Sequence, residues 1–294
     1  MKKITEIINS GKVLGSDGAW GTFLQAKGLN AGECPELWNI DRPDDVYEIA
    51  KSYIDAGADM IETNSFGGSR YKLQGYGLEN RVYELNKAAV EISRKAAGEN
   101  KYVLGSIGPS GKILMMGDVT GDELYKAYKE QSVALAEGGA DAIIIETFTD
   151  IQEANIAINA TRENTFCEII CTMTFDKTAD GRYFTMMGVS PTAMTQSLVE
   201  AGADIVGANC GNGMENMLGI VQEIRLTNQD IPILIHANAG MPVYQDGETF
   251  FPETPEETAG YIPELIKAGA NIIGGCCGTS PEHIRRICDA IRKV

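Results

Sequence analysis

The sequence predicts a single α/β domain, a (β/α)8 TIM barrel that spans residues 1–294. Eight short apolar segments are each followed by a helical pattern, and eight such alternations favour a closed barrel over an open sheet. The length of 294 residues and the 44% hydrophobic content suit this fold, which typically needs about 250 residues. The predicted strands span residues 13–19, 58–64, 102–109, 141–147, 168–175, 204–210, 232–239 and 271–277.

Four near-identical tetrapeptides support this count, because they introduce the second, fourth, sixth and eighth predicted strands. Each has a glycine in its second position, namely Gly57, Gly139, Gly202 and Gly269. A glycine just after a helix can adopt the left-handed conformation that lets the chain turn directly into a strand. The tetrapeptides therefore mark helix ends rather than binding sites.

Capping residues mark where the predicted helices begin. Pro43 opens a helix that runs to Ala56, and Ser280 and Pro281 occupy the N-cap and the first position of the last helix. His283, in the first turn of that helix, is expected to be exposed. Three long connections follow strands, on the side where barrel enzymes carry substrate loops. They span residues 22–41, 66–79 and 240–254.

The composition argues against several classes of partner. A net charge of −16 and a pI near 4.6 would repel nucleic-acid phosphates and anionic lipid, so we expect neither nucleic acid nor a membrane as a partner. No apolar run approaches the roughly 18 residues of a transmembrane helix, and the first residues lack the apolar core of a secretory signal. We therefore expect a cytoplasmic protein.

Three of the seven cysteines stand at the ends of predicted strands. Cys210 ends the sixth strand, and Cys276 and Cys277 end the eighth. These strand ends lie on one face of a barrel, separated by a single strand, so the three thiols can converge. Neighbouring residues of a regular strand point to opposite faces, but the glycines around the Cys276–Cys277 pair allow the strand to break and both thiols to turn to one side.

Three thiolates can hold zinc. At about 2.3 Å from a tetrahedral ion, they leave one position open, which is typical of a catalytic zinc site. A cysteine pair can also be core packing or a vicinal disulfide, and a dithiol redox protein remains an alternative that predicts no zinc. The other cysteines are interpreted as small apolar residues. They are Cys34, Cys167, Cys171 and Cys288.

Carboxylates and an amide also stand at strand ends. Asp17 and Glu146 end the first and fourth strands, where they could face a substrate ammonium or instead accept hydrogen bonds from loop amides. Glu62 is a weaker candidate of the same kind. His236 lies two residues before Asn238, deeper on the same face of the seventh strand, where we expect a hydrogen-bonded core histidine. Two histidines in all argue against a Ser-His-Asp triad, and no glycine-rich phosphate motif is present.

At these positions the chain resembles the homocysteine S-methyltransferase family, and within it the homocysteine-binding domain of cobalamin-dependent methionine synthases. The resemblance extends over essentially the whole chain and is most specific in its cysteine motifs. It implies that Cys210, Cys276 and Cys277 bind zinc, that Asp17 and Glu146 hold the amino acid substrate, and that Asn238 approaches the metal when the substrate is absent. The matching motifs are Asp-Gly-Ala-Trp-Gly-Thr at 17–22, Glu-Thr-Asn-Ser-Phe-Gly at 62–67, Gly-Ser-Ile-Gly-Pro at 105–109, Glu-Thr at 146–147, Asn-Cys at 209–210, Asn-Ala-Gly-Met-Pro at 238–242 and Gly-Gly-Cys-Cys-Gly-Thr at 274–279.

The resemblance further implies an enzyme that methylates homocysteine to methionine, with methylcobalamin supplied by a separate corrinoid protein as the donor. Trp20 and the segment 211–213 depart from the better-known members. The sequence also accounts for one barrel only, without folate-binding or cobalamin-binding modules. Two alternatives stay open: a methyltransferase that uses S-methylmethionine or betaine, and a non-catalytic zinc-binding module of a methyltransfer complex.

Overall fold

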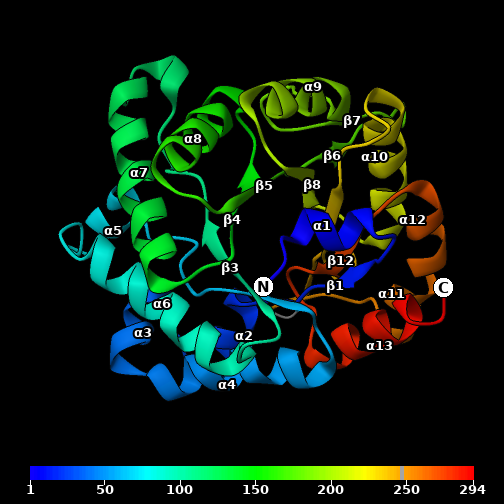
Figure 1. Cartoon of the computed structure of the whole chain (residues 1–294), viewed down its shortest axis with the longest axis horizontal. Helices are drawn as coiled ribbons and strands as arrows, with labels where there is room; N and C mark the ends of the chain where they lie inside the picture. Colours follow the sequence, from blue (N-terminus) through cyan, green and yellow to red (C-terminus); the bar gives the residue numbers. More distant parts are fainter. Residues whose placement is uncertain (246–247) are drawn as a thin grey trace.

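The computed structural model describes residues 1–245 and 248–294, and it forms a parallel eight-stranded barrel inside a ring of helices (Figure 1). All eight predicted strands are confirmed, and the order around the barrel is β1-β12-β9-β8-β5-β4-β3-β2. The strands are β1 (Leu14–Gly15), β2 (Met60–Glu62), β3 (Tyr102–Ile107), β4 (Ala142–Phe148), β5 (Glu168–Met173), β8 (Ile205–Asn209), β9 (Ile233–Ala237) and β12 (Ile272–Gly275).

The helices begin and end where the capping residues predict. Pro43 opens α4, which ends at Ala56. The four predicted C-cap glycines all have left-handed backbones, with φ between 96° at Gly202 and 112° at Gly269. The outer helices are α4 (Pro43–Ala56), α6 (Val82–Ala97), α7 (Gly121–Gly138), α8 (Ile151–Asn164), α9 (Pro191–Ala201), α10 (Met214–Thr227), α11 (Pro255–Gly260), α12 (Ile262–Ala268) and α13 (Pro281–Ile291).

The barrel closes at a seam between β1 and β2, which do not pair as a regular ladder. The Asp59 amide donates to the Gly15 carbonyl at 2.7 Å. Further along, the Glu62 amide donates to the Asp17 carboxylate at 2.9 Å. A side chain thus replaces a backbone acceptor at the carboxyl-terminal end of the seam.

Alternation along the strands divides the barrel interior into layers. An apolar cluster includes Leu104 of β3 and Ile144 of β4, together with Ile4 and Ile8 of the short helix α1 (Ile4–Asn9). Helix α1 lies across the barrel opening in Figure 1, and Glu168 of β5 accepts hydrogen bonds from its first amides. Two residues beyond the apolar layer, the inward positions become polar. They are Glu62, Ser106, Glu146, Thr172 and His236.

One expectation about the last helix is wrong. Ser280 caps α13 as predicted, but His283 is buried, with 8% of its surface exposed. Its Nδ1 lies 2.9 Å from the Ser280 hydroxyl and its Nε2 lies 3.0 Å from the Glu253 carbonyl. The histidine acts in the helix cap because the connection after β9 folds back over the start of α13.

The long connections after the strands contain short elements of their own, some of them unpredicted. They are α2 (Gly21–Ala26), η1 (Pro35–Leu37), α3 (Trp38–Asp41), α5 (Arg70–Gln74), η2 (Leu114–Met116) and the hairpins β6 (Asp176–Lys177) with β7 (Tyr183–Phe184) and β10 (Val243–Gln245) with β11 (Glu248–Phe250). Within the described residues, we find no helix with the length and apolar character needed to cross a membrane.

Candidate active site

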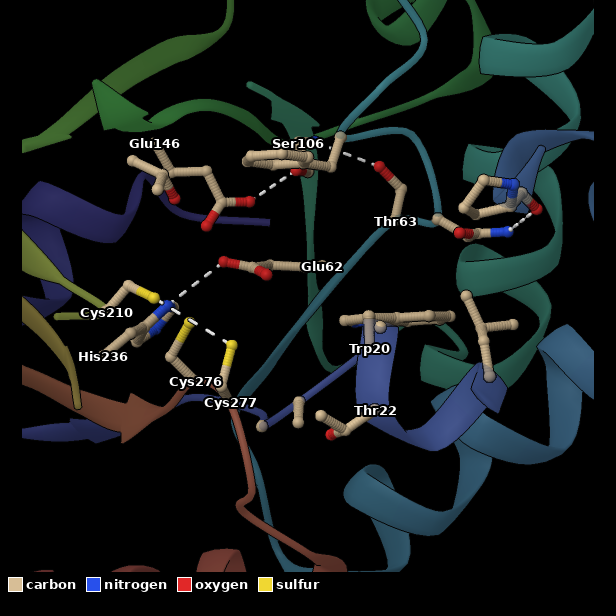
Figure 2. Close-up of a pocket in the computed structure, with 18 of the residues that line it drawn as sticks. Trp20, Thr22, Glu62, Thr63, Ser106, Glu146, Cys210, His236, Cys276 and Cys277 are labelled. Atoms are coloured by element: carbon tan, nitrogen blue, oxygen red, sulfur yellow. Dashed lines mark hydrogen bonds and ion pairs between the residues drawn. The ribbon is translucent and has the colours of Figure 1, made fainter. Parts of the chain in front are cut away.

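A cavity of about 270 Å³ lies at the carboxyl-terminal ends of the barrel strands. Figure 2 shows thiols gathered at one side of it, with Glu62 and Glu146 beside them and Trp20 further along the wall. Among the described residues that line the cavity there is no lysine or arginine. The cavity therefore combines thiols with buried acids, and His236 is the one basic side chain among the described residues that line it.

The three strand-end cysteines come together as the sequence predicts. The Sγ atoms of Cys210, Cys276 and Cys277 all lie within 4.8 Å of one another, and those of Cys210 and Cys277 are 3.9 Å apart. Sulfurs that share a tetrahedral zinc at about 2.3 Å are about 3.8 Å apart. The spacing therefore fits a zinc ion bound by three thiolates.

Local backbone geometry produces this convergence. Cys210 has a left-handed backbone with φ of 58°, which is uncommon for a residue other than glycine, and its amide donates to the His236 carbonyl at 2.9 Å. The Cys276 amide donates to Ala237 of β9 at 2.6 Å. Strand β12 ends at Gly275, so the two adjacent cysteines lie beyond the regular strand and are free of its alternation.

We expected the glycines around the Cys276–Cys277 pair to adopt backbone angles that break the strand, but two of the three have a different role. Only Gly278 has a left-handed backbone, with φ of 80°. Gly274 and Gly275 instead allow close approach, since a Cβ on Gly274 would lie 2.7 Å from the Asp17 carbonyl and one on Gly275 would lie 2.3 Å from the Thr279 hydroxyl. The first contact brings the end of β12 against the segment that follows β1, and the second folds the connection after β12 back over the strand end.

Mutual hydrogen bonding sets the thiol chemistry. Hydrogen bonds from Cys276 and Cys277 lower the pKa of Cys210, while the same interactions raise the pKa of the other two thiols. Asn238 also hydrogen-bonds to Cys210 and lowers its pKa. A metal cation at this position favours the thiolate form of each ligand.

Three glutamates line the cavity, and two of them, Glu62 and Glu146, come from barrel strands. Glu62 and Glu146 both line it and are at most 7% exposed. Burial raises the pKa of each well above its ordinary value. The Ser106 hydroxyl donates to Glu146 Oε1, which partly opposes that shift. A substrate ammonium beside these groups would offset the cost of burying their charge.

Asp17 lies behind this surface rather than on it. Its Oδ2 accepts from the Glu62 amide and from the Trp20 indole N–H, both at 2.9 Å. Asp17 does not line the cavity, whereas Glu62 and Trp20 do. Asp17 therefore supports Glu62 and Trp20 from behind the cavity wall. This matches the alternative that the sequence left open, in which Asp17 accepts hydrogen bonds from loop amides instead of facing a substrate ammonium.

Several buried polar atoms around the cavity have no hydrogen-bond partner among the described residues. They are Glu62 Oε1, His236 Nε2 and Asn238 Oδ1. His236 Nδ1 lies 3.1 Å from Glu62 Oε1, but without the alignment of a hydrogen bond. His236 is therefore not the fully hydrogen-bonded core histidine that we expected. Buried polar atoms without partners are rare in proteins, and their concentration here indicates a site that takes a polar ligand or a metal.

Sequence reasoning gave no role to some residues of the site. Trp20 lines the cavity and orients Asp17, and Glu36 reaches it from η1, where its carboxylate accepts from the Gly67 amide at 2.7 Å. Ser106 could have been found from the predicted third strand, since it follows Leu104 on the inward face. Nothing in the sequence pattern placed Glu36 near β2.

The remaining cysteines lie away from the three-thiol cluster. Burial raises the pKa of Cys34 and Cys288 to about 12, and it also raises the pKa of Cys171 inside β5 and of the half-buried Cys167. These thiols are poor nucleophiles and poor metal ligands in their present surroundings.

The fold and the cavity together define a (β/α)8 barrel with a three-thiol site at the carboxyl-terminal ends of its strands. The sequence model of the homocysteine S-methyltransferase family matches residues 14–291, and the chain belongs to this family. It is 32% identical to the methionine synthase of Mycobacterium tuberculosis and 30% identical to that of Mycobacterium leprae, over 97% and 96% of its own length. It spans only 25% and 24% of those two proteins.

A solved structure shares the whole fold. The metallated form of the homocysteine methyltransferase MmuM from Escherichia coli matches with a TM-score of 0.79 at 23% identity, covering 97% of this chain and 98% of that one. At this level of identity the likeness supports the barrel architecture.

Proposed function

We propose that this protein is a zinc-dependent S-methyltransferase that transfers a methyl group to homocysteine and forms methionine. The observation that carries the proposal is one cavity with three converging thiols at one side and two buried carboxylates beside them. Homocysteine has a thiol and an ammonium group, so it matches both features. Membership of the homocysteine S-methyltransferase family supports the same substrate.

At the thiol side, Cys210, Cys276 and Cys277 would hold the zinc. When bound, zinc supplies a Lewis acid that keeps a coordinated substrate thiol deprotonated at neutral pH, where a free thiol is mostly protonated. Asn238 Oδ1 has no hydrogen-bond partner among the described residues, which suits a group that approaches this position when substrate is absent. In the transfer, the homocysteine sulfur forms the new bond to the methyl carbon, and the donor keeps the electron pair of the broken bond.

At the acid side, Glu146 and Glu62 would receive the substrate ammonium. Both side chains are buried and line the cavity, so a cation between them would be shielded from water and strongly attracted. Asp17 would contribute from behind, by holding the Glu62 backbone and the Trp20 ring in place.

Replacing Asp17 with asparagine should weaken homocysteine use more than zinc binding. The new amide would present an N–H group to donors that now meet a carboxylate, so the Glu62 and Trp20 contacts would loosen. We expect KM for homocysteine to rise roughly fivefold to tenfold, the cost of about one buried hydrogen bond. Steady-state kinetics with zinc analysis of the same sample measure this. Parallel loss of zinc and activity, or unchanged kinetics, would contradict the role.

The methyl donor in this proposal is methylcobalamin carried by a corrinoid protein. The similarity to two methionine synthases supports a donor of this class. Exposed apolar side chains on three connections after strands could contact such a carrier, because solvent-exposed apolar groups commonly mark docking surfaces. These side chains are Met115, Met186 and Tyr244, which are 75% to 82% exposed.

A donor panel tests the function. Zinc-loaded protein with homocysteine should form methionine slowly from free methylcobalamin, faster with a cognate methyl-corrinoid protein, and little from betaine or S-methylmethionine. Methionine is measured by chromatography, with the Cys210→Ala variant as the blank. Rapid turnover with betaine or S-methylmethionine and none with methylcobalamin would overturn the donor assignment. No methionine from any donor would instead indicate a non-catalytic zinc-binding module.

A further inference from the structure

Asn209 ends β8 immediately before Cys210 and is completely buried. Its Oδ1 accepts from the Thr147 amide at 2.9 Å and from the Thr172 hydroxyl at 2.8 Å. Its Nδ2 donates to the Thr147 hydroxyl at 2.7 Å and to Glu146 Oε2 at 3.4 Å. An asparagine amide has two donor hydrogens and two acceptor positions, so this side chain uses its whole hydrogen-bonding capacity.

The segment that Asn209 holds has a strained backbone. Thr147 has φ of 64°, which is a genuine outlier for a β-branched residue. The pairing of β4 with β5 shifts register between Ile145 and Phe148, around this residue. A strained conformation persists only where its surroundings hold it. Two hydrogen bonds supply that support from a different strand: the Thr147 amide donates to Asn209 Oδ1, and Asn209 Nδ2 donates to the Thr147 hydroxyl.

Glu146 directly precedes Thr147, so the same contacts control where its carboxylate points. Ser106 donates to Oε1 and Asn209 donates to Oε2, which holds the carboxylate from two sides. Glu146 lines the cavity but Asn209 does not. Asn209 therefore acts through Glu146 rather than on a bound molecule.

The thiol side of the cavity is held by other bonds. The Cys210 amide donates to the His236 carbonyl, and the Cys210 carbonyl accepts from the Asn212 amide at 2.6 Å. Neither bond involves the Asn209 side chain. A change limited to this side chain would thus disturb the carboxylate while leaving the three cysteines in place.

We infer that Asn209 is a positioning residue that sets recognition of the substrate amino group by orienting Glu146. The inference rests on the proposed function. In the Asn209–Cys210 pair, the Asn209 amide would then act at the end of the cavity that binds the substrate ammonium. The Cys210 thiol would act at the end that binds the substrate sulfur.

The test compares two thiols on zinc-loaded Asn209→Ala: homocysteine, and 4-mercaptobutyrate, which is homocysteine without its amino group. Titration calorimetry gives the Kd of each for the variant and the unsubstituted protein. We expect Asn209→Ala to weaken homocysteine binding about tenfold, as for loss of a hydrogen bond to a charged group. Binding of 4-mercaptobutyrate should stay within about twofold, below the effect of one such bond, and the zinc-to-protein ratio should be unchanged.

Two further variants keep the test decisive. Asn209→Ser retains a polar group but is too short to reach Glu146, so it should give the same selective loss if the alanine variant does not fold. Ser132→Ala removes a buried hydroxyl that pairs with Thr161 at 2.8 Å between α7 and α8, and it should preserve the preference for homocysteine.

The outcomes separate this inference from the function on which it rests. Equal weakening of both thiols by the Asn209 variants, or an unchanged preference, would overturn the positioning role. An unsubstituted protein that binds the two thiols equally well would overturn the proposed ammonium site, and the inference with it.

Discussion

Replacing any one of Cys210, Cys276 and Cys277 with alanine should strip zinc from the protein and abolish methionine formation. Each variant leaves two thiols where three now lie within 4.8 Å of one another. We expect the zinc affinity to fall by more than about a hundredfold, since loss of an outer-shell partner alone costs up to that much. The zinc-to-protein ratio after dialysis and the rate of methionine formation are the measurements.

Two other cysteines provide matched controls. Cys34 and Cys288 are buried outside the cluster, with pKa values raised to about 12 by burial, so Cys34→Ala and Cys288→Ala should keep both zinc and turnover. Full zinc occupancy with full turnover in Cys210→Ala would contradict the ligand assignment.

The barrel could be predicted from the sequence because its signals are local and repeated. A glycine such as Gly57 takes its left-handed conformation from the end of its own helix, independently of the rest of the fold. Period-two alternation decides which residues face inward, so Glu62 and Glu146 could be assigned to the interior once the strands were known. The convergence of the three cysteines followed from strand order, which a closed barrel restricts.

The parts of the site that could not be predicted depend on contacts made by the loops that follow the strands. Asp17 stands at a strand end like Glu146, yet its carboxylate is used by the Trp20 indole and the Glu62 amide. That use depends on the β1–β2 seam, where regular pairing is missing. His283 is buried because a distant carbonyl, that of Glu253, lies over its helix. Neither contact produces a periodic pattern in the sequence, so neither could be predicted from it.

Asp17 and Glu146 show that a position at the end of a strand does not decide whether a carboxylate faces the cavity. Both carboxylates are buried at the functional end of the barrel, and burial raises the pKa of each. Only Glu146 also faces the cavity. Of these two carboxylates, we therefore propose only Glu146 for direct contact with the substrate ammonium, and we expect its substitution to have a larger effect than that of Asp17.

Replacing Glu146 with glutamine should raise the Kd for homocysteine roughly tenfold to a hundredfold, because a charge-assisted hydrogen bond to the ammonium becomes a neutral one. Glutamine has the same shape: its oxygen can still accept from Asn209, and its amide can donate to the Ser106 hydroxyl, which can also accept. The fold should therefore survive. Calorimetric titration of the zinc-loaded variant measures the effect. Zinc content should not change, since the carboxylate is not among the proposed ligands.

The matched control for this substitution is Glu153→Gln. Glu153 is a carboxylate buried to the same degree, but it accepts from the Ser110 amide at 2.9 Å and the Tyr128 hydroxyl at 2.7 Å, and it does not line the cavity. Its substitution should lower stability while leaving the Kd for homocysteine unchanged. If Glu146→Gln binds homocysteine as tightly as the unsubstituted protein, or if both variants weaken binding equally, the ammonium is not held by Glu146.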